Sequence, residues 1–253
     1  MDFNRRKMEA DRKARIEKVA AARRTSDAQV LLPELRRYVQ GGLLHHRLIV
    51  QSDCDPKVAS VANAIANRQY KMNKEQSIEA WRIGDWSQYI MLHARPYRLV
   101  ALRRVLRVCE QTCAPALVSS VWIDYEYPWR HRSKWIAVWQ QLPNPRATMN
   151  ATQCEEFAAL PEEFAIYRGF SKRENERGHS GLSWTLDRTK AEWFARRFSM
   201  NGAWPCIASG RIRKKDVFAY FGDDRGEKEI VVSPNKVRGM TVTALEPAEN
   251  DTL

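Results

Sequence analysis

The second half of the chain alternates short apolar runs with polar loops, as the strands of a sheet do. Runs of roughly four to eight residues rich in β-branched and aromatic side chains are typical of strands. By this criterion we expect strands at 164–168, 182–186, 206–212, 217–221, 229–232 and 240–245. Ala191, Phe194, Ala195 and Phe198 recur at helical spacing, which predicts a helix over 187–198 capped by Asp187. The pattern therefore predicts an α+β arrangement of small sheets.

The first half shows mainly helical spacing instead. Helices are expected over 2–24, from 25–27 to 38–39, from 55 onward, from 74 towards 91, over 96–113 and through 135–142. Gly41-Gly42 should end the second of these helices. The third should carry positions 58, 61, 62 and 65 on one face, and the helix over 96–113 should bury positions 99, 102, 106 and 109. The β-branched and aromatic stretch 118–127 favours a strand. Pro143-Asn144-Pro145 ends the last of these helices, and a short helix is expected over 154–160. We therefore expect a mainly helical region at 1–150 and a second domain at 151–253.

Composition is compatible with a packed, reduced, cytoplasmic protein. The chain has 253 residues, 44% of them hydrophobic, with nine tryptophans, which is enough to fill a core. No apolar run reaches the length of a membrane span, and the N-terminus lacks the apolar core of a signal peptide. The five cysteines are scattered, which favours free thiols and gives no zinc-ligand spacing. We expect no membrane partner and no metal.

The positive charge lies in the first part of the chain. Residues 1–150 carry 26 Lys and Arg against 14 Asp and Glu, whereas residues 151–253 carry 16 of each kind. This asymmetry favours a partner with an acidic surface, either a nucleic acid or a nucleic-acid-associated protein, although solvation of helix surfaces is the alternative. Arg103, Arg104 and Arg107 crowd the helix expected at 96–113, and they are the candidate target-binding residues.

Three of the expected strands carry polar residues that suit chemistry on a dinucleotide. Arg168, at a strand end beside Gly169, supplies a permanently charged fork of donors for a pyrophosphate. Ser183 and Thr185 share one face of the next strand. Glu227 and Glu229, two residues apart at the start of a later strand, are expected to point into one cleft. A fixed carboxylate there would stabilise the oxocarbenium character that develops when the nicotinamide–ribose bond of NAD breaks.

In this order the three strands resemble the Arg-Ser-Glu class of ADP-ribosyltransferases, which includes bacterial toxins and phage-encoded transferases. The resemblance covers about residues 160–245. It implies a split β-sandwich that binds NAD, as substrate, in the cleft between sheets, with no metal. The sequence departs from the family's usual Ser-Thr-Ser by having Trp184 in the middle position, which faces away from the other two residues.

The resemblance also implies roles for single residues. Glu229 would stabilise the oxocarbenium, Glu227 would orient or deprotonate the acceptor, and Ser183 would steady Glu229. Arg168 with Gly169, Ser183 and Thr185 would bind the dinucleotide. Phe194 would line the nicotinamide pocket, although core packing also explains it. The loop 222–226 takes the place of the family's substrate-recognition turn.

Three functions remain open at this point. The first is a mono-ADP-ribosyltransferase that modifies protein arginine or a nucleic acid, with RNA favoured over DNA. It would act as a bacterial toxin, a defence protein or a phage effector, and it could have an antitoxin or another regulatory partner. A glutamate at position 227 favours arginine acceptors by the resemblance, whereas the basic first half suits nucleic acid. The second is an NAD glycohydrolase with water as acceptor. The third is a nucleic-acid-binding protein without enzymatic activity.

Overall fold

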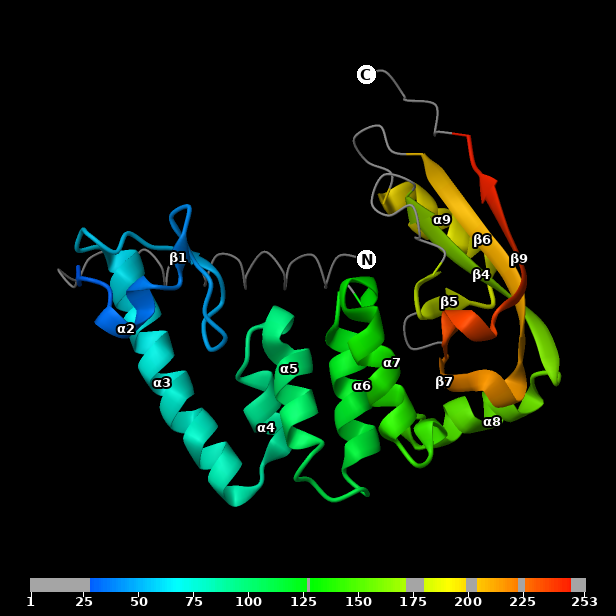
Figure 1. Ribbon diagram of the computed structural model, residues 1–253, viewed down its shortest axis with the longest axis horizontal. Coiled ribbons are helices and arrows are strands. Elements are labelled where there is room, and N and C mark those ends of the chain that lie inside the picture. Colours follow the sequence, from blue (N-terminus) through cyan, green and yellow to red (C-terminus); the bar gives the residue numbers. More distant parts are fainter. Residues whose placement is uncertain (1–27, 127, 172–179, 199–203, 223–225, 247–253) are drawn as a thin grey trace, which may run out of the picture. The chain divides into compact units, whose positions relative to one another are not determined.

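The computed structural model describes residues 28–126, 128–171, 180–198, 204–222 and 226–246. The chain divides into two compact units, Met1–Val105 and Leu106–Leu253. This division differs from the one expected near residue 150, because the helices after residue 113 pack with the second unit. The fold is α+β, with eight α-helices (α2–α9) in the described residues and one antiparallel sheet in each unit (Figure 1). The charged helix expected at 2–24 lies outside the described residues.

The first unit begins with a short helix and a small sheet. Helix α2 (Pro33–Arg36) is followed by β1 (Val39–Gln40), β2 (Leu43–Leu44) and β3 (Ser52–Asp53). Gly41 and Gly42 both have positive φ, 57° and 79°, and they form the two-residue turn of a hairpin between β1 and β2. The prediction that these glycines end a long helix is therefore wrong. The sheet packs around buried Leu31, Leu35 and Leu44.

Three helices complete the first unit: α3 (Val61–Ile83), α4 (Trp86–Met91) and α5 (Arg95–Val105). Helix α3 starts at Val61, where the Ser60 side chain caps it, and not near residue 55 as expected. The apolar face expected at its start is also wrong, since Val58 and Ile65 are exposed. Gly84, with φ 76°, separates α3 from α4. Helix α5 buries Leu99 and Leu102 as predicted but ends before Leu106.

The second unit opens with helices α6 (Ala114–Asp124), α7 (Arg132–Gln141) and α8 (Ala151–Ala159), with the 3-10 turns η1 (Pro128–His131) and η2 (Pro145–Thr148) between them. The strand expected at 118–127 is wrong, because α6 buries Leu117, Val118, Val121 and Trp122 at helical spacing. The helical spacing from Trp135 to Leu142 is confirmed, since the four residues that repeat at this spacing, Trp135, Val138, Trp139 and Leu142, are all buried.

Six strands form the large sheet: β4 (Glu163–Ser171), β5 (Ser183–Thr185), β6 (Pro205–Arg213), β7 (Val217–Phe221), β8 (Glu229–Val232) and β9 (Arg238–Ala244). Turns η4 (Lys214–Asp216) and η6 (Pro234–Lys236) join the strands on either side of them. The strand order is β7-β8-β5-β4-β6-β9, and every pair is antiparallel. All six strands were predicted from the sequence.

The two faces of this sheet are covered differently. Ile166, Trp184 and Ile230 belong to a core cluster that also includes Phe157 of α8. On the other face, Ala191 and Ala195 of α9 (Arg188–Phe198) pack against Ile207 and Tyr167. Figure 1 shows α9 lying along β4 and β6. Ser183, Thr185 and Glu229 lie on the second face, with α9 on it, whereas Arg168 alternates with Tyr167 along β4 and starts from the face of Ile166.

Candidate active site

The three strands that carry the predicted polar residues are direct neighbours in the sheet. Strand β5 lies between β4 and β8, with Tyr167 opposite Thr185 and Thr185 opposite Glu229. Residues directly opposite in an antiparallel pair share a face. Glu229 therefore lies on the same face as Thr185 and Tyr167, away from the core cluster that contains Ile230. The fold thus brings the Arg, Ser and Glu strands together in that order.

Arg168 reaches across the place where β4 and β5 separate. These strands pair at Tyr167 and Thr185, and one Arg168 nitrogen, Nη1, donates a 2.6 Å hydrogen bond to the Ser183 carbonyl. The guanidinium lies against Gly181, where any Cβ atom would collide with it. Gly181 therefore makes room for the Arg168 fork. Gly181 was not among the predicted site residues, although its place just before β5 could have indicated one.

Gly169 has a packing role. It is buried, and a Cβ atom at this position would overlap the Ala191 carbonyl oxygen and the Ala195 amide nitrogen of α9. The missing side chain therefore allows α9 to lie directly on β4. The expectation that Gly169 leaves its backbone open to a dinucleotide does not agree with this contact.

Thr185 uses its hydroxyl to hold the backbone of the site. The hydroxyl donates to the Glu227 carbonyl at 2.7 Å and accepts from the Asp187 amide at 3.0 Å. Thr185 is only 5% exposed, so these bonds form away from water. They tie the residues before β8 to the start of α9. Since its single O–H is engaged, Thr185 supports the backbone of the site and has no further proton to donate to a ribose.

The Glu-x-Glu segment is not a regular strand. Strand β8 begins at Glu229, and Lys228 has a positive φ of 42°. Strand alternation therefore does not relate Glu227 to Glu229, and the reasoning that predicted one shared face is wrong at this point. Glu227 is half-buried, and its carbonyl is fixed by Thr185.

Glu229 is enclosed and accepts a hydrogen bond from an unexpected residue. Its side chain is 7% exposed, and its Oε1 accepts from the indole nitrogen of Trp122 at 3.3 Å. Trp122 comes from α6, which the sequence analysis took for a strand of the other domain. Ser183, the predicted partner of Glu229, lies opposite Val231, and no bond joins its hydroxyl to Glu229 in the described part of the chain. The site therefore includes α6.

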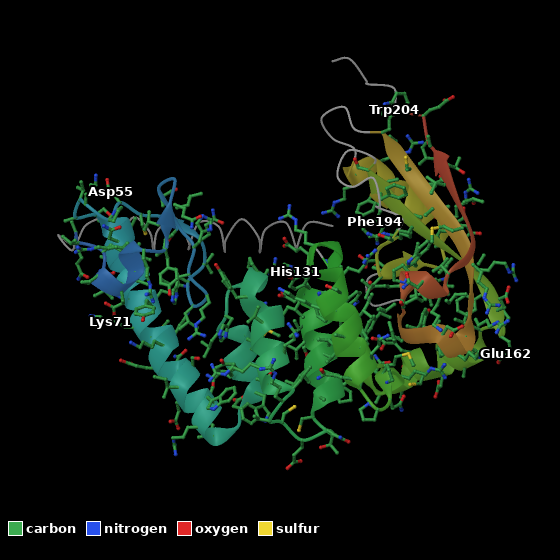
Figure 2. The ribbon with its side chains drawn as sticks, viewed as in Figure 1. Asp55, Lys71, His131, Glu162, Phe194 and Trp204 are labelled. Carbon is green, nitrogen blue, oxygen red and sulfur yellow. The ribbon has the colours of Figure 1, made fainter. Side chains whose placement is uncertain are left out.

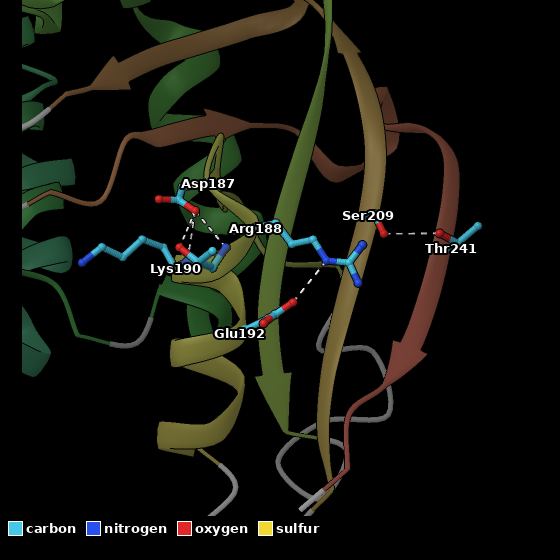
Figure 3. A network of polar contacts seen from close by, with 7 residues as sticks. Asp187, Arg188, Lys190, Glu192, Ser209 and Thr241 are labelled. Atoms are coloured by element: carbon cyan, nitrogen blue, oxygen red, sulfur yellow. Dashed lines mark hydrogen bonds and ion pairs between the residues drawn. The ribbon is translucent and has the colours of Figure 1, made fainter. Parts of the chain in front are cut away.

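Helix α9 is fixed at its start by Asp187, as predicted. One carboxylate oxygen, Oδ1, accepts from the Thr189 amide at 2.8 Å, the Thr189 hydroxyl at 2.6 Å and the Lys190 amide at 3.4 Å (Figure 3). These bonds, with the Thr189 hydroxyl first, lower the pKa of Asp187. Phe194 is half-buried and makes an edge contact with Trp193; Figure 2 places it on α9. The side chain of Phe198 lies outside the described residues.

The three candidate target-binding arginines do not form one helical strip. Arg103 and Arg104 belong to α5, but Arg107 follows its end and lies in the second compact unit. The Arg104 guanidinium stacks over Trp81, 4.4 Å from the ring centroid, and donates to the Tyr89 hydroxyl at 3.4 Å. Arg104 is thus partly engaged in packing, whereas Arg107 is exposed.

A membrane-spanning helix and a metal site were both expected to be absent, and the described residues contain neither. Within them, none of the helices combines the length and apolar character needed to span a bilayer. The described side chains also contain no group of three or more His, Cys, Asp or Glu arranged to hold a metal ion.

Comparison with known proteins identifies no family for this chain. No protein-family model matches the chain, and neither the curated proteins nor the solved structures gave a significant match. A function must therefore be inferred from the residues of the site and the sheet that carries them.

Proposed function

We propose that this protein is a mono-ADP-ribosyltransferase that moves ADP-ribose from NAD to a macromolecule. The observation that carries the proposal is the adjacency of β4, β5 and β8 in one antiparallel sheet. Arg168 and Glu229 are about 60 residues apart in the sequence, with Ser183 between them, yet the three residues lie on neighbouring strands. The strands belong to a single six-stranded sheet, so the proposal rests on their adjacency and not on the cleft between two sheets that the resemblance implies.

Glu229 is the proposed catalytic residue. Cleavage of the nicotinamide–ribose bond leaves positive charge on the ribose, so a fixed carboxylate stabilises the transition state more than the ground state. The enclosed position of Glu229 suits this role, because a carboxylate acts more strongly on a nearby charge where water is excluded. Nicotinamide leaves with the bonding electron pair, and the acceptor takes its place on the ribose carbon.

Arg168 is the proposed binder of the NAD pyrophosphate. Its guanidinium is half-buried and held by the Ser183 carbonyl and the space at Gly181. A guanidinium fixed in this way loses little freedom when it binds an anion. NAD is the substrate, and the charges of two residues suit it. Arg168 supplies a cation for the pyrophosphate, and Glu229 supplies an anion for the positive charge that develops on the ribose.

Glu227 is proposed to act on the acceptor, which is protein arginine or a nucleic acid. Its backbone is fixed by Thr185 just before the catalytic residue, while its side chain stays half-buried. A carboxylate there can orient or deprotonate an incoming nucleophile. Glu227→Gln should therefore reduce transfer more than it reduces NAD hydrolysis; equal losses would remove this separate role.

The experiment is release of nicotinamide from NAD, with and without an extract that supplies acceptors. Labelled NAD would then be followed into the extract, and the product treated with protease or with ribonuclease. We expect nicotinamide release and a label that one of the two treatments removes. Release without any label would favour the glycohydrolase. A chain that neither consumes NAD nor labels any acceptor would contradict the proposal.

A further inference from the structure

The hydrogen bond between Trp122 and Glu229 joins residues 107 positions apart in the sequence. Trp122 is 4% exposed and lies on α6, while Glu229 is 7% exposed and opens β8. The indole nitrogen is the donor and the carboxylate oxygen Oε1 is the acceptor, 3.3 Å apart. A donor that meets a buried carboxylate fixes the direction in which that carboxylate points.

The indole of Trp122 is held in place from behind. Trp135 and Trp139 of α7 meet it edge to face, with ring centroids at 5.0 Å and 5.5 Å. Trp139 in turn stacks on Phe218 of β7 at 5.9 Å, and β7 is the neighbour of β8. This series of side chains therefore starts and ends on adjacent strands of the same sheet. A ring clamped in this way cannot turn its N–H away from Glu229 without disturbing α7.

The chemistry of the indole suits a group that supports a charged carboxylate. An indole N–H donates a hydrogen bond but accepts none, and it does not ionise near neutral pH. It can therefore stabilise the anionic form of Glu229 without competing as an acid or a base. A serine hydroxyl in the same place could rotate and donate elsewhere.

We propose that Trp122 is a positioning residue for Glu229, whose carboxylate it holds in the orientation needed to face the ribose. This inference rests on the proposed function. Its consequence is that the catalytic machinery draws on α6, so that the active unit starts well before residue 151.

Trp86 provides the control, because it belongs to α4 of the first unit, where its ring meets Trp81, and has no part in the proposed site. Changing Trp86 to Phe removes an indole N–H from the first unit, whereas changing Trp122 to Phe removes the one that holds Glu229. Trp135 and Trp139 are left unchanged, because their rings hold Trp122 in place.

The experiment compares Trp122→Phe with Trp86→Phe in the full chain, with nicotinamide release from NAD as the readout. We expect Trp122→Phe to lower kcat about tenfold or more while KM for NAD stays within about twofold, because the missing hydrogen bond acts on the reacting charge. The acidic limb of its pH–rate profile should move to higher pH, since the carboxylate loses a donor to its charged form. Trp86→Phe should keep the parental kcat and the parental profile.

A second variant covers the case in which Trp122→Phe does not fold. Genetic incorporation of 3-benzothienylalanine at position 122 keeps the bicyclic shape and replaces the N–H with sulfur. This variant should show the same loss of kcat and the same shift of the acidic limb. If the parent turns over NAD and all three variants match it, Trp122 is a packing residue and the inference is overturned. If the parent itself does not turn over NAD, the proposed function fails, and this inference fails with it.

Discussion

The Thr185 hydroxyl donates a hydrogen bond to the Glu227 carbonyl at 2.7 Å and accepts one from the Asp187 amide at 3.0 Å. A single buried side chain therefore connects the backbone that leads into β8 with the start of α9. Because Lys228, between Glu227 and Glu229, has a positive φ, this backbone depends on such support.

Replacing Thr185 tests this connection. Thr185→Val keeps the shape but leaves the Glu227 carbonyl and the Asp187 amide without their partner, so the free energy of unfolding should fall by about 1–3 kcal/mol. Transfer activity should fall as well, because Glu227 loses its anchor. Thr185→Ser keeps the hydroxyl and should stay close to the parent. Chemical denaturation of the three proteins measures the effect, and equal stability of the Val variant and the parent would contradict the role given to this hydroxyl.

Arg168 and Gly181 should act together in NAD binding. Arg168→Lys keeps the charge but loses the fork, and Gly181→Ala places a methyl group where the guanidinium lies, so each variant should bind NAD more weakly by about tenfold. Arg211→Lys is the matched control, because Arg211 forms an exposed ion pair with Glu163 on the same sheet. Titration with NAD measures the three affinities. An unchanged affinity in both site variants would place the pyrophosphate elsewhere.

The sequence predicted the sheet well because each strand carries its own local signal. The runs that became β7 and β8 matched the structure at both ends, and Asp187 was correctly placed as the cap of α9. These features depend on residues close together in the chain. The neighbouring order of β4, β5 and β8 in the sheet was not predicted, because it depends on pairing between residues far apart in the chain.

The parts that could not be predicted depend on long-range packing. The contact of Trp122 with Glu229 could not be predicted, because nothing in the sequence near 118–127 indicates a hydrogen bond to residue 229. The β-branched residues of α6 also hid its helical spacing, because burial outweighed their strand propensity. Gly41 and Gly42 were taken as a helix end, whereas their positive φ values serve a hairpin, and the same glycine pair suits both.

Acid should destabilise the first unit through His46. Burial first, then the charge of Arg47, lowers the pKa of His46 to about 4, and the ring lies between Tyr38 and Tyr70. The unfolded chain, with a pKa near 6.5, takes up a proton between pH 6.5 and 4 that the folded unit does not. Stability should therefore fall as the pH falls through this window.

The pH dependence of unfolding in the full chain measures this effect. His46→Gln keeps an acceptor for the Leu48 amide but does not titrate, so its stability should vary less between pH 6.5 and 4. Some slope should remain, because burial also lowers the pKa of His93. A His46→Gln variant with the full parental slope would contradict this assignment.

Arg103 and Arg104 of the first unit, together with Arg107 just after it, should recruit the target. Neutralising Arg103, Arg104 and Arg107 to Gln should weaken modification of the macromolecule and reduce its salt slope by about one unit for each phosphate that the protein no longer neutralises. Hydrolysis of NAD without target should be unchanged, since these residues lie outside the proposed site. Loss of the Arg104 stacking on Trp81 should cost about 0.5–1 kcal/mol of stability.

A charge-matched control separates specific recognition from net charge. Lys57, Arg68 and Lys71 are exposed residues of the first unit, and their joint replacement by Gln removes the same charge. Target modification is to be measured at two salt concentrations for both triple variants. If the two triples weaken modification equally, the three arginines are not a binding site, and if neither has an effect, the first unit does not recruit the target by charge.

The most direct measurement is nicotinamide release by Glu229→Gln. The amide keeps the shape of the side chain and an oxygen that can accept from Trp122, so folding and NAD binding should be retained while the charge facing the ribose is removed. We expect turnover to fall about 100-fold or more. Glu163→Gln, which removes an exposed carboxylate on β4, should retain parental turnover. Turnover by Glu229→Gln close to that of the parent would contradict the assignment of Glu229 as the catalytic residue.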